Sequence, residues 1–176
     1  PLVMRFMHMH PALQIELNCD DRYVNLVEQG VDVAVRLGKL ADSTLGAAYL
    51  GLNPWVLAAS PGYLKAHGRP RKPQDLGRHE ALIYSTVQGD ERWLLSGTDG
   101  RQISVSVRGR LRSNNLSMLL AAARQGFGIA ALPRYVAHRS LTEGALTSVL
   151  DDWALPSQEV HAVFPSPRMV PAKVRL

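Results

Sequence analysis

Cysteine is almost absent from this chain, since Cys19 is the only one among 176 residues. A single thiol excludes an internal disulfide and fits a reducing compartment, and we expect Cys19 to be a small buried residue at a strand end. Long apolar runs are also missing, because no stretch approaches the roughly 20 residues that a membrane span needs. The opening residues are interrupted by Arg5, His8 and His10 and do not resemble a signal peptide.

The motifs that mark catalysis or metal binding are missing too. The histidines occur in no H-E-x-x-H motif, no C-x-x-C pair exists, and no serine lies in G-x-S-x-G. The adjacent pairs Asp20-Asp21 and Asp151-Asp152 point their side chains apart, so capping or turn roles suit them better than acid/base chemistry. We therefore expect no enzyme, no metal site and no cofactor. The six histidines are His8, His10, His67, His79, His138 and His161.

Charge alone does not indicate a nucleic-acid-binding surface. The net charge is +5, but the 20 lysines and arginines are dispersed, with no dense basic run and no aromatic-rich RNA-binding motif. A hydrophobic content of 46% with 20% charged residues is typical of a globular protein. A chain of this length can bury one core or the cores of two small lobes.

Residues 21–38, DRYVNLVEQGVDVAVRLG, predict a short helix followed at once by a strand. Asp20 or Asp21 would cap the helix and Gly30 would end it in a left-handed conformation. Valines then alternate with other residues from position 31, which predicts a buried β-branched strand. Arg36 falls near the strand's end, where open α/β sheets bind ligands. Two interpretations stay open, because Arg36 could contact a ligand or pair with an acid such as Asp32.

Residues 112–133, RSNNLSMLLAAARQGFGIAALP, repeat this pattern of helix, stop and strand. Ser113, Asn114 or Asn115 would cap the helix. Its residues 116–123 are apolar almost all round, so both its own core and another subunit should cover it. A buried strand then runs to Pro133. Free N–H groups at the helix start favour an anion, although the asparagines could serve only as caps.

The remaining periodicity gives an α/β order with composition breaks at Ser60 and at residues 151–156. A helix is also expected to begin near Arg168. We predict further helices over 2–9 and 61–66, and further strands over 12–18, 45–50, 55–59, 81–84, 93–95, 103–107 and 160–164.

Several phrases in order resemble the effector-binding domain of LysR-type transcriptional regulators, in particular the CrgA-like subgroup. They are PLVMRF…HPALQIEL, DRYVNLVEQGVDVAVRLGKLADSTL, VLAASPGYLKAHGRPRKPQDLGRH, LRSNNLSMLLAAARQGFGIAALPRY and LTSVLDDWALP. The resemblance implies a type 2 periplasmic-binding-protein fold, with one lobe of residues 1–59 and 157–176 and another of 60–156. The family's N-terminal winged helix-turn-helix is not in this chain. The first strand and the closing helix of the effector domain look incomplete.

The resemblance also implies a role for the chain and for particular residues. The role is that of a cytoplasmic, ligand-sensing domain that binds a small anionic or polar effector between its lobes. It would act in a homodimer, or in a tetramer in the full-length protein. It would not contact a membrane, and DNA would be bound only by the missing domain. The implied effector-binding residues are Arg36, Gly38, Tyr84, Asn114, Asn115, Gly128 and Pro133. The implied dimer interface comprises Val3, Phe6, Met7, His10, Leu116, Leu119, Leu120 and Ala123.

Two other functions stay open at this point. An exported solute-binding protein has the same fold, and an enzyme on that fold is a weaker alternative. The full-length gene separates the first two, because a DNA-binding segment upstream indicates a regulator and a cleavable leader indicates a transport receptor.

Overall fold

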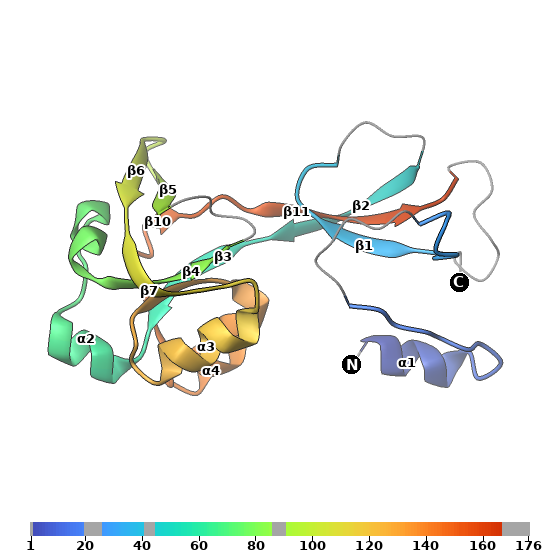
Figure 1. Cartoon of the computed structure of the whole chain (residues 1–176), viewed down its shortest axis with the longest axis horizontal. Helices are drawn as coiled ribbons and strands as arrows, with labels where there is room; N and C mark the ends of the chain where they lie inside the picture. Colours follow the sequence, from blue (N-terminus) through green and yellow to red (C-terminus); the bar gives the residue numbers. More distant parts are fainter. Residues whose placement is uncertain (1, 20–25, 41–44, 86–90, 167–176) are drawn as a thin grey trace. The chain divides into compact units, whose positions relative to one another are not determined.

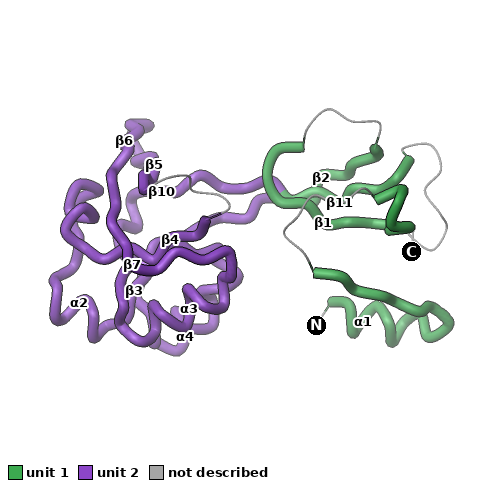
Figure 2. Tube along the Cα trace, in the orientation of Figure 1, with its two compact units in different colours: residues 1–51, 160–176 green, residues 52–159 purple. Residues whose placement is uncertain are grey.

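The computed structural model describes residues 2–19, 26–40, 45–85 and 91–166 (Figure 1). The chain forms two compact units: unit 1 comprises residues 1–51 and 160–176, and unit 2 comprises residues 52–159 (Figure 2). These bounds differ from the predicted lobes at residues 52–59 and 157–159, which belong to unit 2. Residues 55–59 form a strand paired with two other strands of that unit.

In its described residues, unit 1 combines one helix with a three-stranded sheet. The helix α1 (Leu2–Met9) has the predicted bounds, and none of its residues is buried. The sheet has the order β1-β11-β2, with β1 antiparallel to β11. Its strands are β1 (Ala34–Leu37), β11 (Gln158–Phe164) and β2 (Gly46–Asn53).

Three predictions for unit 1 are wrong. No strand forms over residues 12–18, because a strand exists only through a hydrogen-bonded neighbour and no described strand pairs with this segment. Cys19 follows that segment and is exposed rather than buried. The valine face around β1 is also not buried, since Val35 is 66% exposed while Arg36 on the other face is half-buried.

The predicted helix before β1 lies only partly within the described residues. Residues 26–30 form a turn, and Gly30 has the expected left-handed φ of 63°. The proposed caps Asp20 and Asp21, and the helix predicted from Arg168, lie outside the described residues.

Unit 2 is built on a five-stranded sheet of order β7-β4-β8-β3-β9. Strand β4 runs parallel to both β7 and β8, as expected for the central strands of an α/β sheet. The helix α3 connects β7 to β8 and packs beside α4 on one face of the sheet (Figure 1). These elements are β3 (Trp55–Ala59), β4 (Glu80–Tyr84), β7 (Arg108–Ser113), α3 (Leu116–Arg124), β8 (Ile129–Pro133), α4 (Arg134–Thr142) and β9 (Thr147–Val149).

A smaller sheet and two short helices complete unit 2. The sheet has the order β10-β5-β6, with β5 (Arg92–Gly97) and β6 (Gln102–Ser106) forming the predicted hairpin and β10 (Trp153–Ala154) pairing with β5. Helix α2 (Pro61–His67) begins at Ser60, whose hydroxyl accepts from the Tyr63 N–H, and ends at Gly68. The 3₁₀ helix η1 (Pro73–Arg78) follows. β7, α4, β9, β10 and η1 were not predicted from the sequence.

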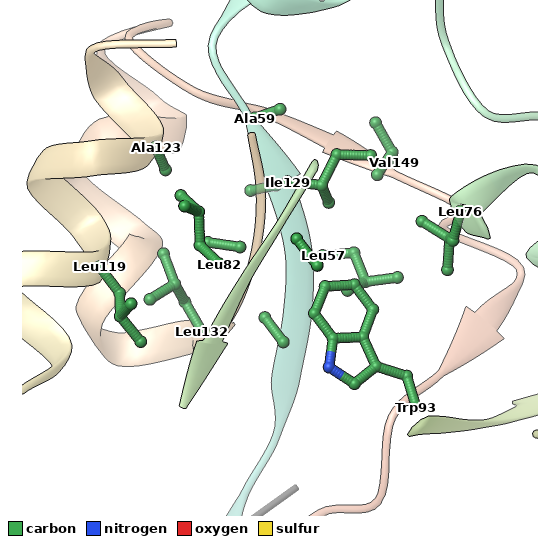
Figure 3. Packing of buried hydrophobic residues seen from close by; sticks show 14 of the residues in the cluster. Leu57, Ala59, Leu76, Leu82, Trp93, Leu119, Ala123, Ile129, Leu132 and Val149 are labelled. Atoms are coloured by element: carbon green, nitrogen blue, oxygen red, sulfur yellow. The ribbon is translucent and has the colours of Figure 1, made fainter. Parts of the chain in front are cut away.

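The core of the described protein lies in unit 2, on both faces of the five-stranded sheet. On one face, Leu119 and Ala123 of α3 meet Leu82 and Leu132 of the strands (Figure 3). On the other face, the Trp93 indole of β5 and Leu76 of η1 cover the sheet near Leu57 (Figure 3). Both faces of the sheet are therefore covered by apolar side chains, and polar groups can be exposed at the two edges formed by the ends of its strands.

Candidate functional site

Four strands of unit 2 meet at one edge of the sheet. The parallel strands β4, β7 and β8 end there, and the antiparallel strand β3 begins there. Tyr84 pairs with Ser113, and Trp55 pairs with Pro133, so the edge reads Ser113, Tyr84, Pro133, Trp55 across the sheet. We call these four residues, with the following Asn114 and Asn115, the carboxyl edge. It is the edge at which open α/β sheets bind ligands.

Backbone and ring contacts hold the carboxyl edge in place. The Ser85 N–H donates to the Ser113 carbonyl at 3.1 Å, and the Arg134 N–H donates to the Pro54 carbonyl at 2.8 Å. The rings of Trp55 and Tyr84 lie with centroids 5.7 Å apart at 43°. Trp55 is 8% and Tyr84 7% exposed, so the two rings support the edge from within.

The helix α3 begins at this edge, and its cap is complete. The Asn115 side-chain oxygen accepts from the N–H groups of Ser117 (2.9 Å) and Met118 (3.1 Å). The Ser113 hydroxyl accepts from the Asn115 N–H at 3.0 Å. Asn115 thus has the capping role that the sequence left open, and Asn114 is the exposed side chain beside it. The positive end of the α3 dipole still faces this edge.

The structure brings Tyr84, Asn114, Asn115 and Pro133 together at the carboxyl edge but places Gly128 elsewhere. Gly128 precedes β8 whereas Pro133 ends it, so the two residues lie at opposite edges of the sheet. A side chain at Gly128 would meet the Glu80 carbonyl oxygen at the start of β4. This close backbone approach accounts for the glycine, and we remove Gly128 from the predicted site.

Arg36 and Gly38 belong to unit 1. Arg36 is half-buried in β1, opposite His161 of β11. Gly38 follows the strand with a φ of 98°, a left-handed conformation that favours glycine. Their participation in a site stays a prediction.

A second polar cluster lies at the opposite edge of the sheet, around the Tyr63 hydroxyl. This oxygen accepts from the Glu80 N–H at 2.9 Å, which leaves its hydrogen to donate to Nδ1 of His79, 3.3 Å away. The His67 ring stacks on Tyr63 with centroids 4.3 Å apart. Burial raises the pKa of Tyr63, and burial followed by the nearby His67 lowers the pKa of His79. The cluster ties α2 to β4 and lies away from the carboxyl edge.

Comparison with known proteins places this architecture in a family. Residues 1–176 match the family described as LysR substrate binding domain. The chain belongs to that family. The predicted resemblance and the periplasmic-binding-protein-like α/β fold are thereby confirmed.

Relatives of this LysR domain are regulators of transcription by name. An uncharacterized HTH-type transcriptional regulator of Haemophilus influenzae is 34% identical over 174 residues, which are 99% of the chain and 60% of the relative. The HTH-type transcriptional regulator PtxR of Pseudomonas aeruginosa is 34% identical over 170 residues, 97% of the chain and 54% of PtxR. The chain thus spans little more than half the length of these relatives.

Solved structures of LysR regulators share the fold. The full-length virulence activator AphB of Vibrio cholerae superposes with a TM-score of 0.87 at 29% identity, covering 99% of this chain and 59% of that one. The CrgA regulatory domain of Neisseria meningitidis gives a TM-score of 0.85 at 27% identity, covering 99% of this chain and 85% of that one.

Two residues of the predicted dimer interface of this LysR domain are too deeply buried to belong to it. Leu119 and Ala123 are 0% exposed and face the core of unit 2, so neither can add contact area to a second copy. Their α3 neighbours Leu116 and Leu120 are half-buried. On α1, Val3 and Met7 are exposed, while Phe6 and the following His10 are half-buried with rings 4.5 Å apart.

Three residues at or beside the LysR domain's carboxyl edge were not predicted as site residues. They are Trp55, Ser113, which was predicted only as a possible helix cap, and Gln158, whose side-chain oxygen accepts from the Trp55 indole N–H at 3.0 Å. Trp55 looked like an ordinary first residue of a strand, and only the pairing of β3 with β8 brings it to the edge. The string SNN did signal a helix start, so Ser113 could have been included.

The described residues of the LysR domain were compared with what a metal site and a membrane-spanning helix require. Among them, no group of three or more histidine, cysteine, aspartate or glutamate side chains is arranged to hold a metal ion. No helix in the described part of the chain is long and apolar enough to cross a membrane.

Proposed function

We propose that this chain is the ligand-sensing regulatory domain of a cytoplasmic LysR-type transcription factor, in which a small anionic or polar effector binds between the two units. Arg36 and Gly38 contribute from unit 1. Tyr84, Asn114, Asn115 and Pro133 contribute from the carboxyl edge of unit 2. DNA is bound by another part of the full-length protein.

The observation that carries this proposal is the carboxyl edge itself, found in a chain of the LysR substrate-binding family. Three parallel strands and one antiparallel strand present Ser113, Tyr84, Pro133 and Trp55 side by side at the start of a capped helix. Ligands of open α/β sheets bind at such edges because loops and helix starts, rather than ladder hydrogen bonds, occupy them.

The chemistry of this edge favours an anionic or polar ligand. The α3 dipole places partial positive charge at the edge, and the exposed Asn114 amide can both donate and accept. Two of the first N–H groups of α3 are already bonded to Asn115, so side chains rather than these N–H groups would contact the ligand. An arginine from unit 1 would supply the full positive charge.

Signal transmission in this proposal uses a homodimer, and a tetramer in the full-length protein. Unit 1 exposes apolar residues on α1, among them Val3 and Met7, and α3 exposes Met118. A second copy that covers these residues would remove apolar surface from water. The ligand would shift the dimer only by its differential affinity for two arrangements.

Calorimetry with a ligand from a broad screen tests the site. The probes are small carboxylates, including succinate, benzoate and amino acids, first ranked by the thermal shift that they give to the domain. Arg36→Ala should weaken the selected probe about tenfold or more, as expected for a hydrogen bond to a charged group, whereas the exposed Arg71→Ala should leave affinity unchanged. Equal affinity in the parent and Arg36→Ala would remove Arg36 from the site.

Light scattering tests the dimer. The parent domain should be dimeric well above micromolar concentration, and Val3→Asp combined with Met7→Asp should shift it toward monomer. Leu94→Asp, at an exposed apolar position of the β5 strand in unit 2, is the matched control. A monomeric parent contradicts the homodimer.

A further inference from the structure

The Gln158 carboxamide joins two stretches of chain that are far apart in sequence. Its oxygen lies 3.0 Å from Nε1 of Trp55 and 3.3 Å from Nδ2 of Asn53. Gln158 is half-buried, and Asn53 and Trp55 are buried, so these hydrogen bonds are shielded from most of the solvent. We call these three residues the amide clasp.

The chemistry of the partners fixes how the clasp is oriented. An indole N–H can only donate, so the Gln158 atom that faces Trp55 must be the carboxamide oxygen. The Asn53 atom that faces the same oxygen must then be its amino group. Both bonds therefore depend on one acceptor, and a residue without an acceptor at position 158 breaks them together.

The clasp lies where the chain passes from one unit to the other. Asn53 ends β2 and Trp55 begins β3, just after the boundary between Gly51 and Leu52. Gln158 begins β11, just before the boundary between Glu159 and Val160. One carboxamide thus ties both connecting strands at their unit 2 ends.

The clasp also reaches the carboxyl edge through an aromatic contact. Trp55 is held from one side by Gln158 and lies against the Tyr84 ring at 5.7 Å. Pro54, between Asn53 and Trp55, accepts from the Arg134 N–H at 2.8 Å. The indole is therefore held by one hydrogen bond to Gln158 and by the ring of Tyr84, and the backbone just before it is held by the Arg134 N–H.

We infer that Gln158 is a positioning residue: it orients Trp55 behind Tyr84 and keeps the two connecting strands at a fixed spacing at the carboxyl edge. Its relevance to effector binding rests on the function proposed above. The hydrogen bonds of the clasp involve only residues of this chain, so they are tested without a ligand, and a failed ligand screen would leave this test unaffected.

Indole N–H resonances give a residue-specific test in the whole domain. The chain has three tryptophans, so three indole signals are assigned by single replacements with phenylalanine. Gln158→Met keeps the length of the side chain but removes the acceptor, and Gln158→Glu keeps an acceptor oxygen. The Trp55 indole N–H should exchange with solvent about tenfold faster in Gln158→Met, the size expected from losing roughly one net hydrogen bond, and should stay protected in Gln158→Glu.

A second signal reports on the carboxyl edge. With fluorotyrosine incorporated, the Tyr84 resonance should move in Gln158→Met and in Trp55→Phe, which removes the donor but keeps a ring, and should stay near the parent position in Gln158→Glu. Rescue by glutamate distinguishes orientation by an acceptor from a general loss of packing. Unchanged Trp55 exchange in Gln158→Met, or a Tyr84 signal that moves equally in Gln158→Met and Gln158→Glu, would overturn the inference. If Gln158→Met does not fold, the same measurements are made on Gln158→Leu, which also lacks an acceptor, and an unchanged Trp55 exchange rate in that variant overturns the inference.

Discussion

Unit 1 and unit 2 contain similar apolar patterns but bury them very differently. Within the described part of unit 1, the buried hydrophobic residues are Leu26 and Val163, whereas unit 2 encloses a continuous core on both faces of its large sheet. Valines alternate along residues 31–35 as Ile103 and Val105 alternate in β6 of unit 2, where Val105 is buried, yet Val35 stays exposed. Alternation states which residues share a face, and only a covering element decides whether that face is buried.

The difference between the units also separates two uses of apolar surface. In unit 2 it contributes to the stability of the chain itself, since α3 and the smaller sheet cover the five strands. In unit 1 it is available for contact with a second copy, as proposed above. Substitutions in the two units should therefore change different measured quantities, and four tests follow in order of expected size.

The largest contrast is expected between buried and exposed leucines. Leu132→Ala removes a side chain that is 0% exposed between α3 and the sheet, and should lower the free energy of unfolding by about 2–5 kcal/mol. Leu50→Ala in β2 of unit 1, where the side chain is 58% exposed, should change it by less than about 0.5 kcal/mol. Urea unfolding measures both. Equal losses would mean that the surface of unit 1 is covered in solution.

Two glycines of unit 2 should respond with opposite signs. Gly128→Ala places a methyl group against the Glu80 carbonyl oxygen at a φ of 157°, and should destabilise unit 2 by about 1–3 kcal/mol. Gly62→Ala in α2 meets open space and should stabilise it by about 0.5–1 kcal/mol, because glycine is the poorer helix residue. Melting temperatures distinguish the two. A harmless Gly128→Ala would show that β4 and β8 can separate at this edge.

Removing the α3 cap at Asn115 should lower the free energy of unfolding by less than removing a core side chain does. Asn115→Ala removes the acceptor for the N–H groups of Ser117 and Met118 and should cost about 1 kcal/mol. Asn114→Ala, at the exposed neighbouring position, should leave the free energy of unfolding nearly unchanged. It should still weaken the binding of the ligand selected by the screen. Chemical denaturation and calorimetry are run on both variants. A neutral Asn115→Ala would contradict the cap.

The smallest effect is a dependence of stability on pH at the opposite edge. Burial and the nearby His67 hold the pKa of His79 below its ordinary value of 6.5, although Asp75 opposes this. As pH falls through 6.5, the unfolded chain takes up a proton before the folded one does, so stability is lost with acidification until the folded pKa is reached. His79→Asn keeps an acceptor for the Tyr63 hydroxyl and should flatten the pH dependence of the melting temperature. An unchanged slope in His79→Asn assigns the effect to other groups.

Much of unit 2 could be predicted from the sequence because its local signals agree with its tertiary contacts. Asn115 caps a helix, Ser60 caps another, and residues 129–133 are buried as an apolar strand should be. β7 and α4 were missed for a physical reason. The segment RGRLRS is rich in arginine and becomes a strand through pairing with β4, and α4 starts at Pro133 without a side-chain cap.

The site was predictable only where chain order and spatial order coincide. Asn114 and Asn115 could be found because a helix start is a local feature. Trp55 and Gln158 could not, since their positions follow from strand pairing and from a hydrogen bond across more than one hundred residues of sequence. Gly128 was misplaced because a glycine required by a close backbone approach looks, in sequence, the same as one required by a ligand.

The middle strand of the sheet in unit 1 is the last one to be synthesised. β11 lies between β1 and β2, yet it follows them by the whole length of unit 2. At a synthesis rate of about 5–20 residues per second, β11 is made on the order of 10 s after β1 and β2. Residues 52–159 can fold during this interval. In a chain that ends at Glu159, residues 52–159 should therefore resist proteolysis, whereas residues 26–51 should be cleaved. Protection of both segments in that chain would show that β1 and β2 find another partner first.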